Sequence, residues 1–223
     1  MLCKENSALS QEYKSTVSEA LKALGKKNLA LILHGVSFPS SDGENTGFGT
    51  YNSCGAKRVF DFMDGIFNAL QLGPAGKTKM SDPSPYCGTV FSKNPLFINL
   101  KDLTTSEWEH LLSEATLNNI VENNPSKGTN RASYVYAIQR CDAAMKEVYE
   151  NFKKKASWGL KRRFDKFKKE NAFWLDNDAL YEAFCLENDS DYWPQWQNEL
   201  DRTLFKPVIK KQPKKPMKRI LKN

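Results

Sequence analysis

Apolar residues near the start of the chain change from helical to strand-like spacing. Between Tyr13 and Leu24 they recur three or four residues apart, which predicts an amphipathic helix. Gly25 follows directly and can close that helix in a left-handed cap. The continuous apolar run Leu29–Leu33 then predicts a strand that is buried on both faces.

A second apolar run, Ile66–Leu72, predicts another buried strand, which Gly73 and Pro74 end. The segment 56–64 lies between the strands and predicts a short helix. That helix would bury three apolar residues: Val59, Phe60 and Met63. A loop rich in Ser, Gly, Asn and Asp leads into it over 37–55. The order strand, helix, strand favours a right-handed parallel βαβ unit.

Helical spacing dominates the second half of the chain. Thr104 and Glu107 can form a capping box, and apolar positions as far as Ile120 continue the helix that it would begin. The stripe Tyr134–Phe152 alternates four and three apart, which strongly indicates an amphipathic helix. Two more helices are predicted within Phe164–Phe184. An α/β start is therefore followed by about 100 residues of helices.

The net charge of +7 is concentrated at one end of the chain. Residues 206–223 hold eight Lys and Arg and no acidic residue, so the remainder sums to −1. This Pro- and Lys-rich segment cannot form a packed core, and we expect a disordered basic tail. A second basic stretch, Lys153–Lys169, is interpreted first as the solvated face of a helix. The charge therefore gives no specific indication of nucleic-acid binding.

Cysteine and histidine usage argues against disulfides and metals. The five cysteines are widely spaced and form no Cys-x-x-Cys pair, so free thiols in a reducing cytoplasm are expected. With two histidines, a His-rich metal site is not expected, and we expect no cofactor. The first twenty residues are polar, and no apolar run approaches the roughly 18 residues of a membrane span. We therefore expect a cytoplasmic protein without a membrane segment.

The stretch Gly73–Thr78 follows a predicted strand and resembles a phosphate-binding loop, but two features are missing. A P-loop has glycine at the position of Gln71, and it needs a helix directly after its Thr. Pro83 and Pro85 follow soon after and do not fit such a helix start. Nucleotide binding is not expected at this loop.

Six short motifs follow one another along the chain. They are Leu33–Pro39, Ala69–Pro74, Asp82–Tyr86, Asn94–Ile98, Phe173–Leu180 and Trp193–Trp196. Their order and spacing resemble the amylomaltase (4-α-glucanotransferase) family. In that family the first five segments include His-Pro-Thr-Ser-Leu-Pro, Leu-Pro-Leu-Gly-Pro, Ser-Pro-Tyr-Gln, Asn-Pro-Tyr-Leu-Ile and Trp-Leu-Glu-Asp-Tyr-Ala-Leu, and a Trp-rich segment follows. The resemblance covers about residues 28–204 and rests on the order of the motifs.

Three positions depart from the family pattern. The Pro that follows the family's His is Gly35 here, and the first Pro of Leu-Pro-Leu-Gly-Pro is Gln71. The Gln after Ser-Pro-Tyr is Cys87. This last exchange removes an amide that could hydrogen-bond a sugar hydroxyl, which weakens the case for a sugar contact near Cys87.

The resemblance implies a (β/α)8 TIM-type barrel, of which this chain would form the first strands followed by a helical subdomain. On that basis we expect four segments and an incomplete barrel. The segments are an N-terminal helix (1–26), an N-terminal barrel segment (27–102), a helical subdomain (103–205) and the basic tail (206–223).

Loops at the C-terminal ends of the strands build the active site of such barrels. The resemblance therefore points to four substrate-binding residues: His34, Ser37, Ser84 and Tyr86. A Tyr ring can stack on the apolar face of a sugar, and Ser hydroxyls can bond its hydroxyl groups. Structural alternatives stay open, with Tyr86 covering the core, Ser84 serving a turn before Pro85, and His34 packed at the strand end.

The family's reaction is glycosyl transfer with retention, which uses two carboxylates about 5–5.5 Å apart. The resemblance places both carboxylates, and a third stabilising Asp, in strands beyond the part of the family matched here. Asp82, Asp176 and Asp178 match no catalytic position. We therefore expect a truncated or split N-terminal portion that is inactive alone. Its ligand would be an α-1,4-glucan or maltooligosaccharide, and a separately encoded C-terminal half is a candidate partner.

Two other functions stay open. The chain could be a non-catalytic α-glucan-binding or regulatory module that uses Ser84 and Tyr86. It could also be a basic nucleic-acid-binding protein that uses the tail and Lys153–Lys169. The sequence shows only unspecific charge, and no recognition element, for the second function.

Overall fold

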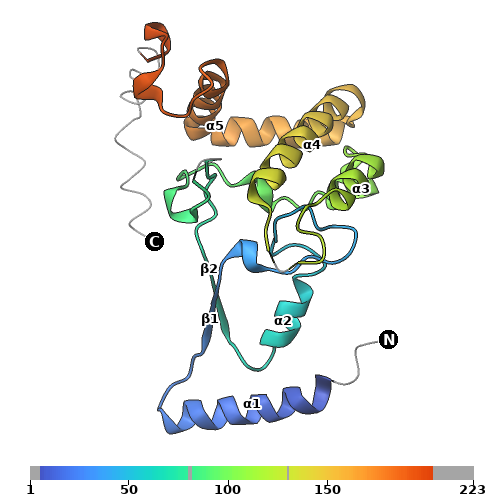
Figure 1. Cartoon of the computed structure of the whole chain (residues 1–223), viewed down its shortest axis with the longest axis vertical. Coiled ribbons are helices and arrows are strands. Elements are labelled where there is room, and N and C mark those ends of the chain that lie inside the picture. Colours follow the sequence, from blue (N-terminus) through green and yellow to red (C-terminus); the bar gives the residue numbers. More distant parts are fainter. Residues whose placement is uncertain (1–5, 80–81, 130, 203–223) are drawn as a thin grey trace. The chain divides into compact units, whose positions relative to one another are not determined.

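The computed structural model describes residues 6–79, 82–129 and 131–202 (Figure 1). The chain divides into two compact units. The first comprises Met1–Thr89 with Lys93–Ala156, and the second comprises Val90–Ser92 with Ser157–Asn223. The basic tail expected at 206–223 lies outside the described residues.

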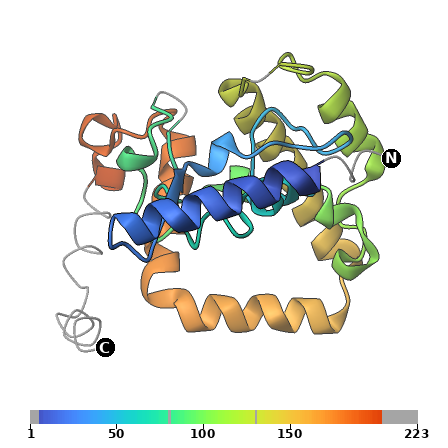
Figure 2. The ribbon, with the colours of Figure 1, turned by 90° about the horizontal axis from the view of Figure 1, so that it is seen from below.

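The first unit begins with helix α1 (Asn6–Ala23), which Figure 2 shows as an unbroken helix. Gly25 has the left-handed φ of 60° that the sequence predicts for the cap. The Lys26 N–H donates to the Leu21 carbonyl (2.8 Å), which completes the Schellman pattern. The predicted apolar stripe is not buried, because Tyr13 is 57% and Leu24 is 71% exposed.

Strands β1 (Ala30–Leu33) and β2 (Ala69–Leu72) pair in parallel, with Ala30 opposite Ala69. Helix α2 (Lys57–Met63) lies between them in the chain, which confirms the predicted parallel strand–helix–strand order. The two strands make a two-stranded sheet within the described residues. The rest of the described chain is helical or irregular.

The prediction that these strands are fully buried is wrong. The side chain of Ile32 is 66% exposed and that of Leu72 is 39% exposed. Helix α2 buries Met63 as predicted. Phe60 was predicted to be buried as well, but its side chain is 44% exposed. Apolar composition indicates a tendency to be buried, but burial also needs neighbouring layers, and two strands cannot supply them.

The loop after β1 is held by one buried carboxylate. Glu44 accepts hydrogen bonds from the backbone N–H groups of Ser41 (2.8 Å), Gly55 (2.8 Å) and Cys54 (3.1 Å). The Ser41 hydroxyl donates a further bond of 2.5 Å. Gly55 passes so close to the Pro39 carbonyl oxygen that a Cβ would lie 2.4 Å from it. The carboxylate thus folds the loop back onto itself.

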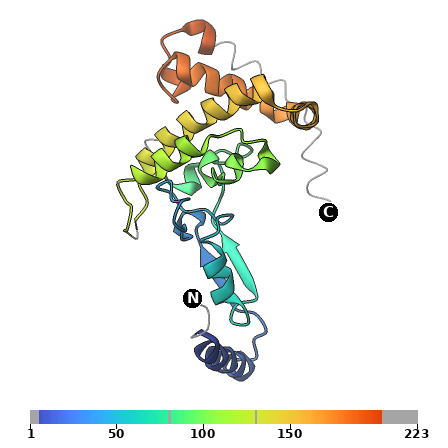
Figure 3. The same cartoon turned by 90° about the vertical axis from the view of Figure 1, so that its right-hand side faces the viewer.

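Helices α3 (Glu114–Glu122) and α4 (Tyr134–Lys155) pack together in the first unit (Figure 3). Helix α4 confirms the predicted stripe. The main core cluster consists of Leu100, Leu103, Leu112, Leu117, Ile120, Val121 and Ala144. A second cluster surrounds Cys141, and burial raises the pKa of that thiol to about 12. Cys141, Cys54, Cys87 and Cys185 are free thiols.

The predicted capping box at Thr104 and Glu107 does not form. Thr104 lies in the short helix η4 (Asp102–Thr104), and its hydroxyl donates to the Lys101 carbonyl. Glu107 lies in a second short helix, η5 (Ser106–Trp108). Glu109 then has a left-handed φ of 53°, which ends the turn.

Replacing Ser113 by alanine is expected to lower the free energy of unfolding of the first unit by about 1 kcal/mol. Ser113 is the N-cap of α3, and its hydroxyl accepts from the Thr116 N–H (3.2 Å). Urea titration followed by circular dichroism would measure the loss. Ser106→Ala serves as the control, because Ser106 is an exposed residue of η5. An equal loss in both variants would contradict the capping role.

The second unit is built on helix α5 (Trp158–Glu187). The sequence predicts two helices here, but the structure has a single continuous one of 30 residues. Residues 162–170 are all exposed, as expected of a solvated basic face. Near its middle, α5 packs Trp174 against the ring of Phe91 (centroids 5.9 Å apart).

The helix η6 (Trp193–Gln195) leads to Trp196, which is 1% exposed. Trp196 packs between the α5 residues Tyr181 and Phe184. It therefore anchors the segment after α5 to that helix. Across the described parts of both units, none of the helices is long and apolar enough to cross a bilayer.

Candidate functional site

The site forms where the two parallel strands end. His34 directly follows β1 and leads into the short helix η1 (Gly35–Ser37). Gly73 and Pro74 directly follow β2. Because parallel strands end at the same edge of a sheet, the loops that follow them meet there.

The loop that carries Ser84 and Tyr86 is closed at its base. Gly76 and Lys93 form an antiparallel bridge, and the Thr89 N–H donates to the Lys77 carbonyl (3.0 Å). A Cβ at Gly76 would lie 2.2 Å from the Thr89 carbonyl oxygen, so the two arms of the loop are in close contact. These contacts hold the two ends of the loop together.

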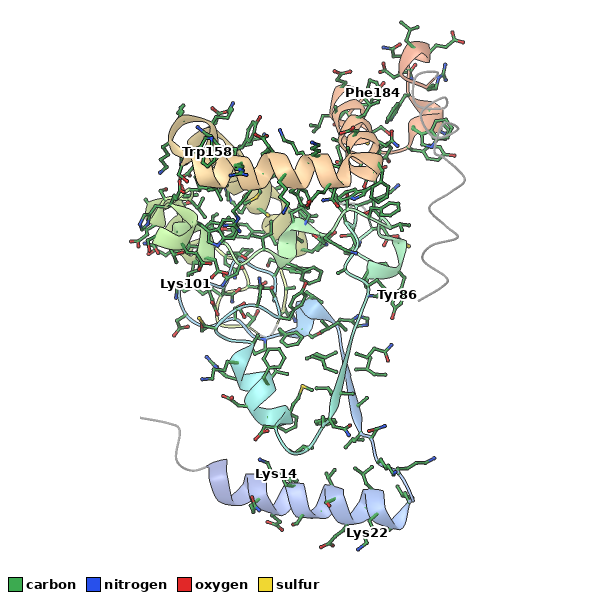
Figure 4. The ribbon with its side chains drawn as sticks, turned by 180° about the vertical axis from the view of Figure 1, so that it is seen from behind. Lys14, Lys22, Tyr86, Lys101, Trp158 and Phe184 are labelled. Carbon is green, nitrogen blue, oxygen red and sulfur yellow. The ribbon has the colours of Figure 1, made fainter. Side chains whose placement is uncertain are left out.

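Tyr86 lies in the short helix η2 (Pro85–Cys87) with its side chain 73% exposed and projecting outward (Figure 4). Its ring meets the His34 ring edge to face, with centroids 6.0 Å apart and planes at 88°. The structure therefore brings two of the four predicted site residues into contact.

Ser84 is half-buried and is the N-cap of η2, without a side-chain cap bond. Its N–H donates to the Asp82 carboxylate (2.9 Å), and its carbonyl accepts from the Cys87 N–H (3.1 Å). The bond from Ser84 and one from the Cys87 thiol lower the pKa of Asp82, and the same carboxylate raises the pKa of Cys87. The Cys87 thiol, which stands at the position of the family's Gln, thus bonds the Asp82 carboxylate within this turn.

Ser37 does not join this group. It is exposed at the end of η1, and its N–H donates to the His34 carbonyl (2.9 Å). Ser37 is also not among the residues that line a cavity beside His34. The predicted role of Ser37 therefore rests on its place in the motif alone.

A cavity of about 210 Å³ lies beside His34 in the first unit. Its walls are mainly apolar, and the residues that line it include Phe48, Pro74, Pro83, Pro85, Phe97 and Tyr134. The lining residues with polar side chains are His34, Thr78, Asn94 and Tyr134. The prolines on either side of Ser84 thus form one wall of the cavity, so the Ser84–Tyr86 turn borders it.

A polar network on the cavity wall was not predicted from the sequence. The Tyr134 hydroxyl bonds the Thr78 hydroxyl and donates to the Lys79 carbonyl (3.0 Å). The Asn94 side-chain amide donates to the same Thr78 oxygen (3.1 Å). Tyr134 belongs to the apolar stripe of α4, so its spacing marked it as a core residue. The Asn94-Pro95 motif and the Gly73–Thr78 stretch were the signals that pointed to this region.

Within the described residues, no three His, Cys, Asp or Glu side chains gather as metal ligands would. Ser92 donates to Asp178 (2.5 Å) in the second unit, so that carboxylate holds the start of the unit to α5. Asp82 is engaged in its own turn, as described above.

Comparison with known proteins agrees with the motifs at this edge. The sequence profile of the 4-alpha-glucanotransferase family matches residues 33–220. The chain belongs to this family. It is 28% identical over 127 residues to a 4-alpha-glucanotransferase of Thermus thermophilus, an alignment that covers 56% of this chain and 23% of that protein. The chain thus spans less than a quarter of that relative. No solved structure matches it.

Membership of the 4-alpha-glucanotransferase family confirms the resemblance inferred from the ordered motifs. The matched region begins at the last residue of β1, directly before His34, and includes both arms of the Tyr86 loop. It also includes the whole of α5. The family implies a TIM-barrel-type fold, whereas the described residues are mostly helical and contain one parallel pair of strands, β1–β2.

Proposed function

We propose that this chain forms part of the α-glucan-binding wall of a 4-α-glucanotransferase. Such an enzyme transfers α-1,4-glucan segments to glucose or maltooligosaccharide acceptors by a retaining double displacement. The observation that carries the proposal is the exposed ring of Tyr86 beside a cavity at the C-terminal ends of two parallel strands. Substrates bind at this end of the sheet in α/β-barrel enzymes.

The chemistry of these side chains suits a glucan. The exposed face of Tyr86 offers a flat apolar surface on which a glucose ring can stack. Ser84 and Ser37 offer hydroxyl groups that both donate and accept hydrogen bonds, and His34 offers a ring nitrogen. Because Cys87 is engaged with Asp82, it is not assigned a sugar contact.

We propose further that the two catalytic carboxylates come from outside this chain. The exposure of Ile32 and Leu72 supports this arrangement, because strands of a TIM-type barrel are buried on both faces. In a complete barrel further strands would cover these residues. A reducing cytoplasm fits the exposed thiols of Cys54 and Cys87.

Replacing Tyr86 by alanine is expected to raise the Kd for maltoheptaose by about 10-fold or more, because the stacking surface is lost. Isothermal titration calorimetry on the full chain would measure this change. Tyr149→Ala is the matched control, because Tyr149 is a 53% exposed tyrosine on α4 that the proposal does not use. Similar losses in both variants, or no binding by the wild type, would refute the proposal.

The non-catalytic glucan-binding module is the second candidate, and an activity assay separates the two. The chain alone should not release glucose from maltotriose if the carboxylates lie elsewhere. Disproportionation of maltotriose by the purified chain would show that the carboxylates are its own. If a C-terminal half of the family restores activity when mixed with this chain, the module alternative fails.

A further inference from the structure

The Tyr86 ring is held from one side by His34, which comes from a segment 52 residues earlier in the chain. Their edge-to-face contact joins the end of β1 to the turn η2. Within the described residues, this is the one ring contact of the Tyr86 side chain, and no hydrogen bond of its hydroxyl is found. The orientation of this largely exposed ring therefore depends on His34.

His34 is in turn seated against Gly73, the residue after β2. A Cβ at Gly73 would lie 2.2 Å from the His34 Nδ1 and 2.9 Å from its Cε1, so the imidazole ring lies directly on the glycine backbone. Only glycine leaves room for the ring in this position. The ends of both strands thus hold the same imidazole.

The His34 Nδ1 is buried and has no hydrogen-bond partner among the residues that the structure describes. No hydrogen bond at Nδ1 sets the direction of the ring. Packing between Gly73 and Tyr86 does so instead.

From this arrangement we infer that His34 is a positioning residue that holds the Tyr86 ring in place for stacking on a sugar. This inference rests on the proposed function, and it changes the expected role of His34 from sugar contact to support of Tyr86. A ring that is fixed before binding loses less conformational freedom when the glucan arrives, which strengthens binding. Gly73 contributes to the same arrangement, because it leaves space for the imidazole ring of His34.

Three variants of the full chain test this role. His34→Ala removes the supporting ring, His34→Phe keeps a ring but removes both nitrogens, and Gly73→Ala pushes the imidazole away. Gly159→Ala is the control for the last, because a Cβ there would meet only the Ser157 hydroxyl at 3.7 Å. Thermal unfolding would confirm that each variant is folded.

Two readouts are needed. Proton NMR of selectively labelled tyrosine reports the position of the Tyr86 ring without ligand, and calorimetry gives the Kd for maltoheptaose. His34→Ala and Gly73→Ala should shift the Tyr86 ring signals towards those of a free tyrosine and raise the Kd by about 2- to 12-fold. His34→Phe and Gly159→Ala should keep the affinity within about twofold of wild type.

The outcomes separate the possible roles of His34. If His34→Phe weakens binding as much as His34→Ala, a ring nitrogen contacts the sugar directly and the positioning role is overturned. Unchanged Tyr86 signals in His34→Ala would also overturn it. If the wild-type chain does not bind maltoheptaose, the proposed function fails, while the ring signals still decide whether His34 holds Tyr86.

Discussion

Replacing Trp196 by alanine is expected to destabilise the second unit by about 3–5 kcal/mol. Trp196 is 1% exposed, and its ring lies 6.0 Å from that of Tyr181 and 5.7 Å from that of Phe184. Its Nε1–H donates to the Ser190 carbonyl (2.8 Å). Alanine would remove this packing, leave a cavity and deprive the carbonyl of its donor.

Urea unfolding followed by near-ultraviolet circular dichroism would measure the effect of Trp196→Ala. Trp158→Ala is the matched control, because Trp158 is 74% exposed on α5 (Figure 4) and its loss should cost about 0.5 kcal/mol or less. Trp196→Phe should fall between the two, since it keeps a ring but loses the N–H donor. Equal losses for Trp196→Ala and Trp158→Ala would contradict an anchoring role.

Features that depend on a single segment were predictable from the sequence. The stripe of α4 and the cap at Gly25 both follow from residues close together in the chain. The order of the strands and α2 was also predictable, because a buried-strand pattern flanks one short helical segment. In these cases local preference and final structure agree.

The wrong predictions concern features that depend on neighbours. The Thr104 hydroxyl bonds a carbonyl within its own turn, and the left-handed backbone at Glu109 and His110 interrupts the expected helix. The residue types Glu and His do not predict a left-handed backbone conformation. The exposure of Ile32 depends on layers around the sheet, which an apolar run cannot reveal. The two helices predicted at the C-terminal end are one continuous helix, because no residue between them interrupts α5.

The candidate site was partly predictable for the same reason. His34 and the Ser84–Tyr86 turn were candidates because motifs shared with the family mark the loops after both strands, and the structure places His34 against Tyr86. The bond between Thr78 and Tyr134 joins residues 56 apart, and each has a simpler local explanation. The seat of His34 on Gly73 is likewise a tertiary contact that no spacing could indicate.

Replacing Glu44 by glutamine is expected to lower the free energy of unfolding of the first unit by about 2–3 kcal/mol at pH 7. The Glu44 side chain is buried, and both carboxylate oxygens accept hydrogen bonds from Ser41, Cys54 and Gly55. Glutamine has nearly the same shape, but its amide nitrogen donates. One of the backbone N–H groups would then face a donor in place of an acceptor.

The same carboxylate predicts a pH dependence whose sign is fixed by its surroundings. Burial alone would raise the pKa of Glu44, but the hydrogen bonds from Ser41, Gly55 and Cys54 outweigh it and lower the pKa below 4.5. Its stabilisation is therefore complete above about pH 4.5 and is lost as the pH falls through the lowered pKa.

Urea titrations of wild type and Glu44→Gln at pH 7, 4.5 and 3 should show their difference in stability shrinking below pH 4.5. Glu122→Gln removes an exposed carboxylate and should show no such convergence. A difference between wild type and Glu44→Gln that stays constant down to pH 3 would contradict the assignment, because the carboxylate would then not be the group that stabilises the loop.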